Sequence, residues 1–442
     1  MVSSVPPTPD AGLDVDVRAI WEKPLVPATG GEATLLVRIA APAADRSGTR
    51  RAPVDVAFVL DRSGSMAGDK LDLVKEAVNV AVAHLGDADR AALVVYDNAV
   101  DVLHPLQPAT SRAKAALRLA LHGVDPGGAT DLGAGWLTGC GELGRAIPDG
   151  GTDGAPVRVR RALLLTDGQA NVGITDPGDL ATHAHELRAR GISTTTLGVG
   201  LDFDEALLAG MAEAGGGNFQ FVDGPGDLRR FFDGELRGML GVAAAGLSLS
   251  LTLPHGVRAY LVNAFPVERR GKRLTVALRD LPAGDVLDLV FTLRVAPGAV
   301  GTAHQVAVQV AWSDPAADAR RTIAPPVAPL GLADAATVAA TAVDPLAAEM
   351  AAAQRATAER REGLRLDRAG RHAESRDRMR SAAALLQAAP MTAAIAEDLA
   401  LTERYAEAAA SAPYAEYDRK AGAFHNARRA RGNRDDLGSA GS

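Results

Sequence analysis

The chain has 442 residues, of which 47% are hydrophobic and 23% charged, and its formal net charge is −7. This length exceeds one ordinary core and predicts two or three domains. The acidic balance argues against sequence-independent nucleic-acid binding, which needs a basic surface, so we expect no nucleic-acid partner. The lone cysteine, Cys140, excludes an internal disulfide and favours a reducing, cytoplasmic setting.

The N-terminal segment, residues 1–12, is rich in Pro and Ser, and we expect it to be disordered. It has neither the basic nor the apolar region of a secretory signal. The longest uncharged stretch, from Gly238 to Pro254, is shorter than the roughly 20 residues of a spanning helix. Its alternating leucines fit a half-buried strand better, so we expect no membrane span.

Residues 13–50 contain two runs of alternating apolar residues, LDVDVRAIW and ATLLVRIAA, which predict strands. Residues 51–241 then alternate apolar runs, such as VDVAFVL and RRALLLTDG, with helical patterns. This alternation predicts an α/β fold with a doubly wound, mostly parallel sheet that helices cover on both faces.

Four segments follow the α/β region. Residues 242–315 carry short apolar runs separated by Gly and Pro turns, which is typical of a β-sandwich. Because strands lie on both sides of the α/β region, we expect one sandwich with that region inserted. We expect a linker over 316–333, a helical domain over 334–427 and a disordered tail over 428–442, whose basic cluster comprises Arg428, Arg429, Arg431 and Arg434.

A short polar loop, Asp61-Arg62-Ser63-Gly64-Ser65, follows the first α/β strand and precedes a helix. It therefore lies at the carboxyl edge of the predicted sheet, where open α/β sheets bind ligands. One carboxylate and two hydroxyls at alternating positions can converge on an ion if the loop turns tightly, and Gly64 permits that turn. Oxygen donors favour Mg²⁺, with Mn²⁺ or Ca²⁺ as alternatives, over zinc.

Two later segments supply matching groups. Thr130 lies in the glycine-rich stretch GGATDLG before a helix, and Asp167 follows the strand LLLT. Three loops can therefore meet at one edge of the sheet. Taken singly, each residue also has a simpler explanation. Asp61 or either serine could cap the following helix, and Asp167 could be a turn residue.

Together these motifs resemble the von Willebrand factor A domain family. The family pattern D-x-S-x-S, a later Thr and a later Asp falls on Asp61, Ser63, Ser65, Thr130 and Asp167 without substitution. The resemblance covers roughly residues 50–241. It implies a metal-ion-dependent adhesion site in which the three hydroxyls bind the ion directly and the two aspartates bind it directly or through water.

The resemblance also implies a function. A site of this kind leaves one coordination position open, and a glutamate or aspartate of a protein partner fills it. Domains of this family carry no general base or nucleophile, so we expect no enzyme; a metal hydrolase would need more clustered carboxylates or histidines. The Ala-, Arg- and Gly-rich composition favours a bacterial source.

A second interpretation concerns the partner. Intracellular domains of this family resemble the non-catalytic subunits that work with AAA+ ATPases in MoxR-type and chelatase systems. An AAA+ ATPase is therefore an alternative partner. The chain itself lacks the G-x-x-x-x-G-K-[ST] pattern of a phosphate-binding loop.

Several nearby residues have structural interpretations. We expect Asp131 to start a helix and Asp97 and Asn98 to form a turn. Arg62 is expected to point toward solvent near the ion, either to steer an acidic partner or simply as a solvated side chain of the loop. Cys140 is expected to be a small buried residue, because no histidine is paired with it.

Overall fold

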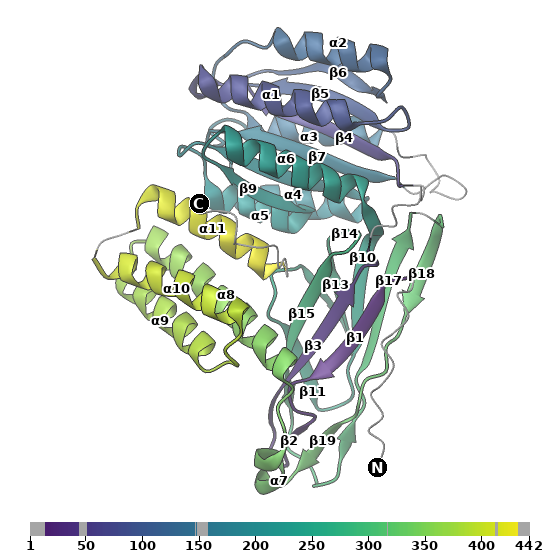
Figure 1. Cartoon of the computed structure of the whole chain (residues 1–442), viewed down its shortest axis with the longest axis vertical. Coiled ribbons are helices and arrows are strands. Elements are labelled where there is room, and N and C mark those ends of the chain that lie inside the picture. Colours follow the sequence, from purple (N-terminus) through teal and green to yellow (C-terminus); the bar gives the residue numbers. More distant parts are fainter. Residues whose placement is uncertain are drawn as a thin grey trace.

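The computed structural model of the protein describes residues 14–43, 51–145, 147, 158–315, 317–411 and 414–431. The segments predicted to be disordered, 1–12 and most of 428–442, lie outside the described residues. Figure 1 shows an α/β layer at the top, a group of long strands below it and a group of helices beside both.

A six-stranded sheet forms the centre of the α/β part. Its spatial order is β6 (Val100–Pro108), β5 (Arg90–Tyr96), β4 (Val54–Asp61), β7 (Val159–Thr166), β8 (Ile192–Val199) and β9 (Gly216–Val222). Neighbouring strands are parallel except β5 and β6. Every residue of β4 is buried, as in a central strand covered on both faces. The predicted mostly parallel sheet is confirmed.

Helices cover both faces of this sheet. They are α1 (Asp69–His84), α2 (Ser111–His122), α3 (Leu132–Gly144), α4 (Pro177–Ala189), α5 (Glu205–Gly215) and α6 (Pro225–Leu240), and a 3₁₀ turn, η1 (Gly64–Met66), precedes α1. One core includes residues of α1, α2 and α6, and the other includes residues of α3, α4 and α5. The Asp131 side chain accepts the N–H of Ala134 at the start of α3, as predicted.

Two antiparallel sheets form the sandwich. The first sheet has the order β1 (Asp16–Trp21), β3 (Gly31–Ala40), β15 (Val286–Val295) and β11 (Val257–Leu261). The second has the order β12 (Val267–Arg270), β13 (Arg273–Ala277), β10 (Val242–Thr252), β17 (Ala307–Asp314) and β18 (Ala319–Ile323), with β14 (Leu281–Pro282) beside β10. Both sheets contribute to one hydrophobic core.

The α/β part interrupts this sandwich, since β1 and β3 precede it and the other strands follow it. A short third sheet has the order β16 (Ala303–His304), β19 (Leu330–Ala333) and β2 (Leu25–Pro27). In Figure 1 it lies at the end of the sandwich away from the α/β part. The predicted insertion of an α/β region into a β-sandwich therefore matches the observed order of strands.

The C-terminal part is helical. Its helices are α7 (Ala335–Ala340), α8 (Pro345–Arg368), α9 (His372–Gln387), α10 (Ala393–Ser411) and α11 (Glu416–Ala430). Met350 of α8 packs with Leu36 and Val290 of the first sandwich sheet, and Ala427 of α11 joins the α/β core. The helices therefore contact both other parts. No helix within the described ranges is long and apolar enough to span a membrane.

Two predicted segments are wrong. The linker predicted over 316–333 contains β18 and β19, which complete two sheets. Strands of five and four residues are too short to leave a clear alternating pattern. The tail predicted from residue 428 begins too early, because α11 continues to Ala430 and Arg431 is only 2% exposed. The Arg431 guanidinium lies 5.9 Å from the ring centre of Phe265, which helps to bury it.

Candidate functional site

Asp61 ends β4 and is fully buried. Its Oδ1 accepts the backbone N–H of Ser63 at 2.7 Å, and its Oδ2 accepts the Thr166 hydroxyl at 2.6 Å. Burial raises the pKa of Asp61 above its ordinary value, with a smaller contribution from the charge of Asp167, although the hydrogen bonds oppose the shift. Among the described residues, Asp61 is thus a buried carboxylate whose hydrogen-bond donors are neutral.

The loop after β4 turns through η1 and brings two hydroxyls together. Ser63 Oγ lies 3.2 Å from Ser65 Oγ, and Ser65 Oγ donates to Oδ1 of Asp167 at 2.8 Å. Asp167 directly follows β7 and is fully buried. The ends of two neighbouring strands are therefore connected through side-chain oxygen atoms.

Backbone hydrogen bonds join this loop to the glycine-rich loop before α3. Gly64 donates to the carbonyl of Gly128 at 3.0 Å, and Gly127 donates to the carbonyl of Arg62 at 2.6 Å. A Cβ on Gly127 would lie 1.8 Å from a carboxylate oxygen of Asp97, so a glycine is required for this approach. The glycines allow the third loop to reach the first.

Thr130 lies in this third loop and is 4% exposed. A Cβ added to Gly168 would lie 3.4 Å from Thr130 Oγ1 and 3.6 Å from Asp61 Oδ2. A hydroxyl and a carboxylate therefore border one small space that the glycine leaves free of side-chain atoms. Asn171 fixes the loop, because its Oδ1 accepts the N–H of Thr130 at 2.9 Å.

Lys70, in the first turn of α1, reaches the same edge. Its Nζ donates to Asp167 Oδ2 at 2.5 Å and to Asp202 Oδ2 at 3.0 Å. Burial alone would lower the pKa of Lys70, but the hydrogen bonds and charges of the two aspartates outweigh it and raise the pKa. Gly200, with φ +72°, leaves room for Lys70, because an added Cβ would lie 3.2 Å from its Cε.

The donor chemistry suits a hard cation. Within the described ranges, no three His, Cys, Asp or Glu side chains converge as a metal site. A cation at this edge would therefore depend on hydroxyl oxygens in addition to Asp61 and Asp167. Mg²⁺, Mn²⁺ and Ca²⁺ accept such all-oxygen ligand sets, so the residues present fit the predicted ion.

A family comparison decides what the α/β part is. Residues 55–233 match the von Willebrand factor type A domain. The α/β part is a VWA domain. A von Willebrand factor type A protein from Catenulispora acidiphila superposes with a TM-score of 0.70 at 21% identity, covering 88% of this chain and 89% of that one. The shared fold therefore extends beyond the VWA domain into the sandwich and helices.

Two bacterial relatives align over longer stretches than the VWA domain. The Escherichia coli (strain K12) protein YfbK, described as uncharacterised, is 29% identical over 280 residues, 61% of this chain and 47% of that protein. The Synechocystis protein sll0103, also described as uncharacterised, is 26% identical over 308 residues, 66% of this chain and 69% of that protein. The chain thus spans about half the length of the first relative and about two thirds of the second.

The sequence does not single out Lys70, Thr166 or Asp202, which complete this edge of the VWA domain. Thr166 immediately precedes Asp167, so its position in LLLTDG is the one signal that could have identified it. Lys70 and Asp202 lie far apart in the chain, and only the folded structure brings their side chains together.

Arg62 differs from the expectation that it points toward solvent near the ion. It pairs with Asp97 at 3.3 Å and Asp101 at 2.7 Å, and its side chain is 21% exposed. Asp97 and Asn98 form the turn between β5 and β6, as predicted, and Asp97 accepts the N–H of Ala99. Cys140 is buried, as predicted, and burial raises the pKa of its thiol to about 12.

Proposed function

We propose that this VWA domain binds a divalent cation and uses it to hold a glutamate or aspartate of a protein partner. Ser63, Ser65 and Thr130 would contribute hydroxyl ligands, and Asp61 and Asp167 would bind the ion directly or through water. Mg²⁺ is the proposed ion, with Mn²⁺ or Ca²⁺ as alternatives, because hard cations prefer oxygen ligands. The ion would supply the attraction for the partner's carboxylate.

The charge balance of the site is the main support. Asp61 and Asp167 are both fully buried, and Lys70 pairs with Asp167 and Asp202. No ion pair to Asp61 is found among the described residues, whose hydrogen bonds to it come from Ser63 and Thr166. A buried carboxylate without a positive partner is costly, so a cation beside Asp61 would stabilise the site.

We place this binding in a reducing, cytoplasmic compartment. The single cysteine of the chain, the buried Cys140, agrees with such a compartment because it forms no disulfide within the chain. The partner is defined only by the acidic group that it presents. An AAA+ ATPase with such a group would satisfy the proposal, but no contact of the described residues favours it over another acidic protein.

The test measures metal binding and partner capture together. Tagged protein mixed with an extract of its native host should retain a partner in Mg²⁺ and release it in EDTA. Asp61→Asn should weaken Mn²⁺ binding, measured by calorimetry, by roughly 10- to 100-fold and should abolish capture. Asp72→Asn, at an exposed position of α1, is the matched control and should change neither. Capture that is equally strong in EDTA would refute the proposal.

A further inference from the structure

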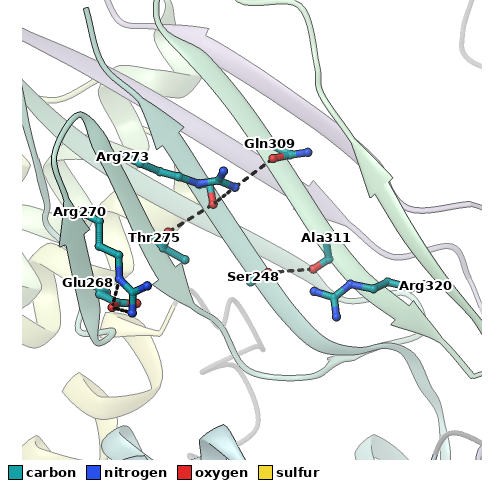
Figure 2. Close-up of a pocket in the computed structure, with 9 residues that line it drawn as sticks. Ser248, Glu268, Arg270, Arg273, Thr275, Gln309, Ala311 and Arg320 are labelled. Atoms are coloured by element: carbon teal, nitrogen blue, oxygen red, sulfur yellow. Dashed lines mark hydrogen bonds and ion pairs between the residues drawn. The ribbon is translucent and has the colours of Figure 1, made fainter. Parts of the chain in front are cut away.

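The outer face of the second sandwich sheet has a polar hollow of about 370 Å³. Side chains from five adjacent strands line it, those of β12, β13, β10, β17 and β18. Figure 2 shows three arginines around it, Arg270, Arg273 and Arg320. It belongs to the sandwich and shares no residue with the metal edge of the VWA domain.

The alternation along β10 explains the hollow. The leucines of this strand enter the sandwich core, whereas Ser248 and Ser250 face outward. Across the ladder, Ser248 is paired with Ala311 of β17 and Ser250 with Thr275 of β13. Small outward side chains therefore form the floor, and longer side chains from the same and flanking strands form the rim.

The rim carries more positive than negative charge. Arg270 pairs with Glu268 at 2.7 Å. Arg273 donates from Nη2 to Ser250 Oγ at 3.0 Å and to a glutamine amide oxygen at 3.1 Å, both neutral acceptors. The guanidinium group of Arg320 makes no hydrogen bond or ion pair within the part of the chain that the structure describes. Two of the three guanidinium groups therefore have no carboxylate partner there.

The arginines approach the floor from different sides. Arg270 and Arg273 are paired across the β12–β13 ladder, and Arg273 lies beside the C-terminal end of β10. Arg320 is paired with Ser313 of β17, which lies beside the N-terminal part of β10. In Figure 2, Arg320 extends toward Ala311 from the side opposite Arg273. Hydroxyls lie between these two positive regions, and no aromatic side chain lines this hollow in the described chain.

We propose that the hollow binds a small hydrophilic polyanion with phosphate or carboxylate groups at its two ends. Guanidinium groups match the oxygens of such anions in paired hydrogen bonds, and the hydroxyls of the floor can bond to polar atoms between them. Ser250 Oγ lies 3.4 Å from the Thr275 hydroxyl and also accepts from Arg273, so part of the site is ordered before a ligand arrives.

The test uses inorganic tripolyphosphate as the probe, titrated by calorimetry into metal-free full-length protein at constant ionic strength. Wild type should bind it saturably. The double variant Arg273→Met with Arg320→Met should bind at least about tenfold more weakly, because two charged contacts are lost. Arg118→Met removes one exposed positive charge on α2 and should change nothing. Circular dichroism verifies that each variant is folded.

Further measurements sharpen the result. Glu268→Gln should strengthen binding, since it removes the negative charge beside Arg270. Orthophosphate should bind at least about tenfold more weakly than tripolyphosphate, because one group cannot reach both positive regions. Citrate as a second probe separates a carboxylate ligand from a phosphate one, and saturable binding of either supports the proposal.

Three results would overturn it: no saturable binding of either probe, equal binding by wild type and the double variant, or equal losses in the double variant and Arg118→Met. Binding of a Glu-rich peptide through Arg273 and Arg320 without binding of either probe would also overturn it, because the surface would then be a protein interface.

Discussion

Strand β4 carries a buried aspartate near each end, and the two have different surroundings. Asp55 and Asp61 both have no exposed surface. Asp55 is surrounded by three arginines, with Arg158 at 2.6 Å, Arg90 at 2.9 Å and Arg160 at 3.6 Å. Asp61 instead receives hydrogen bonds from a backbone N–H and a hydroxyl.

The contrast separates a cluster of ion pairs from the proposed binding site. At the amino edge of the VWA sheet, the chain itself supplies the cations, so that the buried charge is already paired. At the carboxyl edge, the described side chains around Asp61 supply hydroxyls, and positive charge must come from elsewhere. The different surroundings of the same residue type on one strand support the proposal that the carboxyl edge receives a cation.

The largest effect is expected at the amino edge. Asp55→Asn leaves three arginines crowded together without their shared carboxylate, and the side chains of Arg158 and Arg160 are only 14% and 10% exposed. We expect a loss of about 3–5 kcal/mol in the free energy of unfolding, measured with urea. Mn²⁺ affinity of the folded variant should stay at the wild-type value. If Asp55→Asn weakened Mn²⁺ binding as much as Asp61→Asn, the contrast between the two edges would fail.

The stability of the amino edge also depends on pH, because this edge contains a second buried carboxylate. Asp89 is buried, pairs with Arg51 at 2.5 Å and accepts the N–H of Val54 at 2.9 Å. Burial alone would raise the pKa of Asp89, but Arg51 and the backbone N–H groups of Val54 and Gly86 lower it below 3.8. Its stabilising contribution is therefore complete above the unfolded pKa and disappears as the pH falls through the lowered folded value.

Asp89→Asn should accordingly cost about 2 kcal/mol at pH 7, the typical value of hydrogen bonds to a charged group. The difference from wild type should shrink as the pH falls below about 3.8, where the unfolded carboxylate protonates. Urea unfolding at a series of pH values measures both effects. The exposed neighbour Asp87→Asn is the control. A difference that stays constant down to the acid limit would assign the effect to packing rather than charge.

The meeting of Asp61 and Asp167 at one edge of the sheet could be predicted from the sequence, whereas their role as metal ligands stays a prediction from the family pattern. Asp61 and Asp167 come at the ends of apolar runs, so the strand pattern alone places them at one edge of the sheet. Lys70 could not be predicted, because its direction depends on a contact with Asp202, which lies in another loop. Periodicity carries no information about such contacts between distant loops.

The same reasoning explains the strands that the sequence did not indicate. The side chains of β18 are mostly exposed, so they show no alternating pattern. The segment is a strand because it pairs with β17. β19 has four residues and is held by β2 and β16. β6 is an edge strand with mainly exposed side chains and ends in Pro108. Strands of this kind are defined by pairing with another strand, which the pattern of their own residues does not reveal.

Lys70 reduces the contrast between the two edges, because it brings a fixed cation to the carboxyl edge. Its ammonium group lies 2.5 Å from Asp167, one of the proposed ligands. A metal ion must therefore compete with it for that carboxylate. We expect Lys70→Met to raise Mn²⁺ affinity about tenfold, or about 1.4 kcal/mol, in a calorimetric titration.

A matched variant separates competition from positioning. Asp202→Asn removes the second partner of Lys70 but keeps its contact with Asp167, so Mn²⁺ affinity should stay level or fall as the ammonium is held by Asp167 alone. If Lys70 competes with the ion, Lys70→Met raises the Mn²⁺ affinity, whereas Asp202→Asn leaves it level or lowers it. A fall in affinity in Lys70→Met would instead mean that the ammonium group orients Asp167 for the metal, and the carboxyl edge would then resemble the amino edge in depending on a cation supplied by the chain.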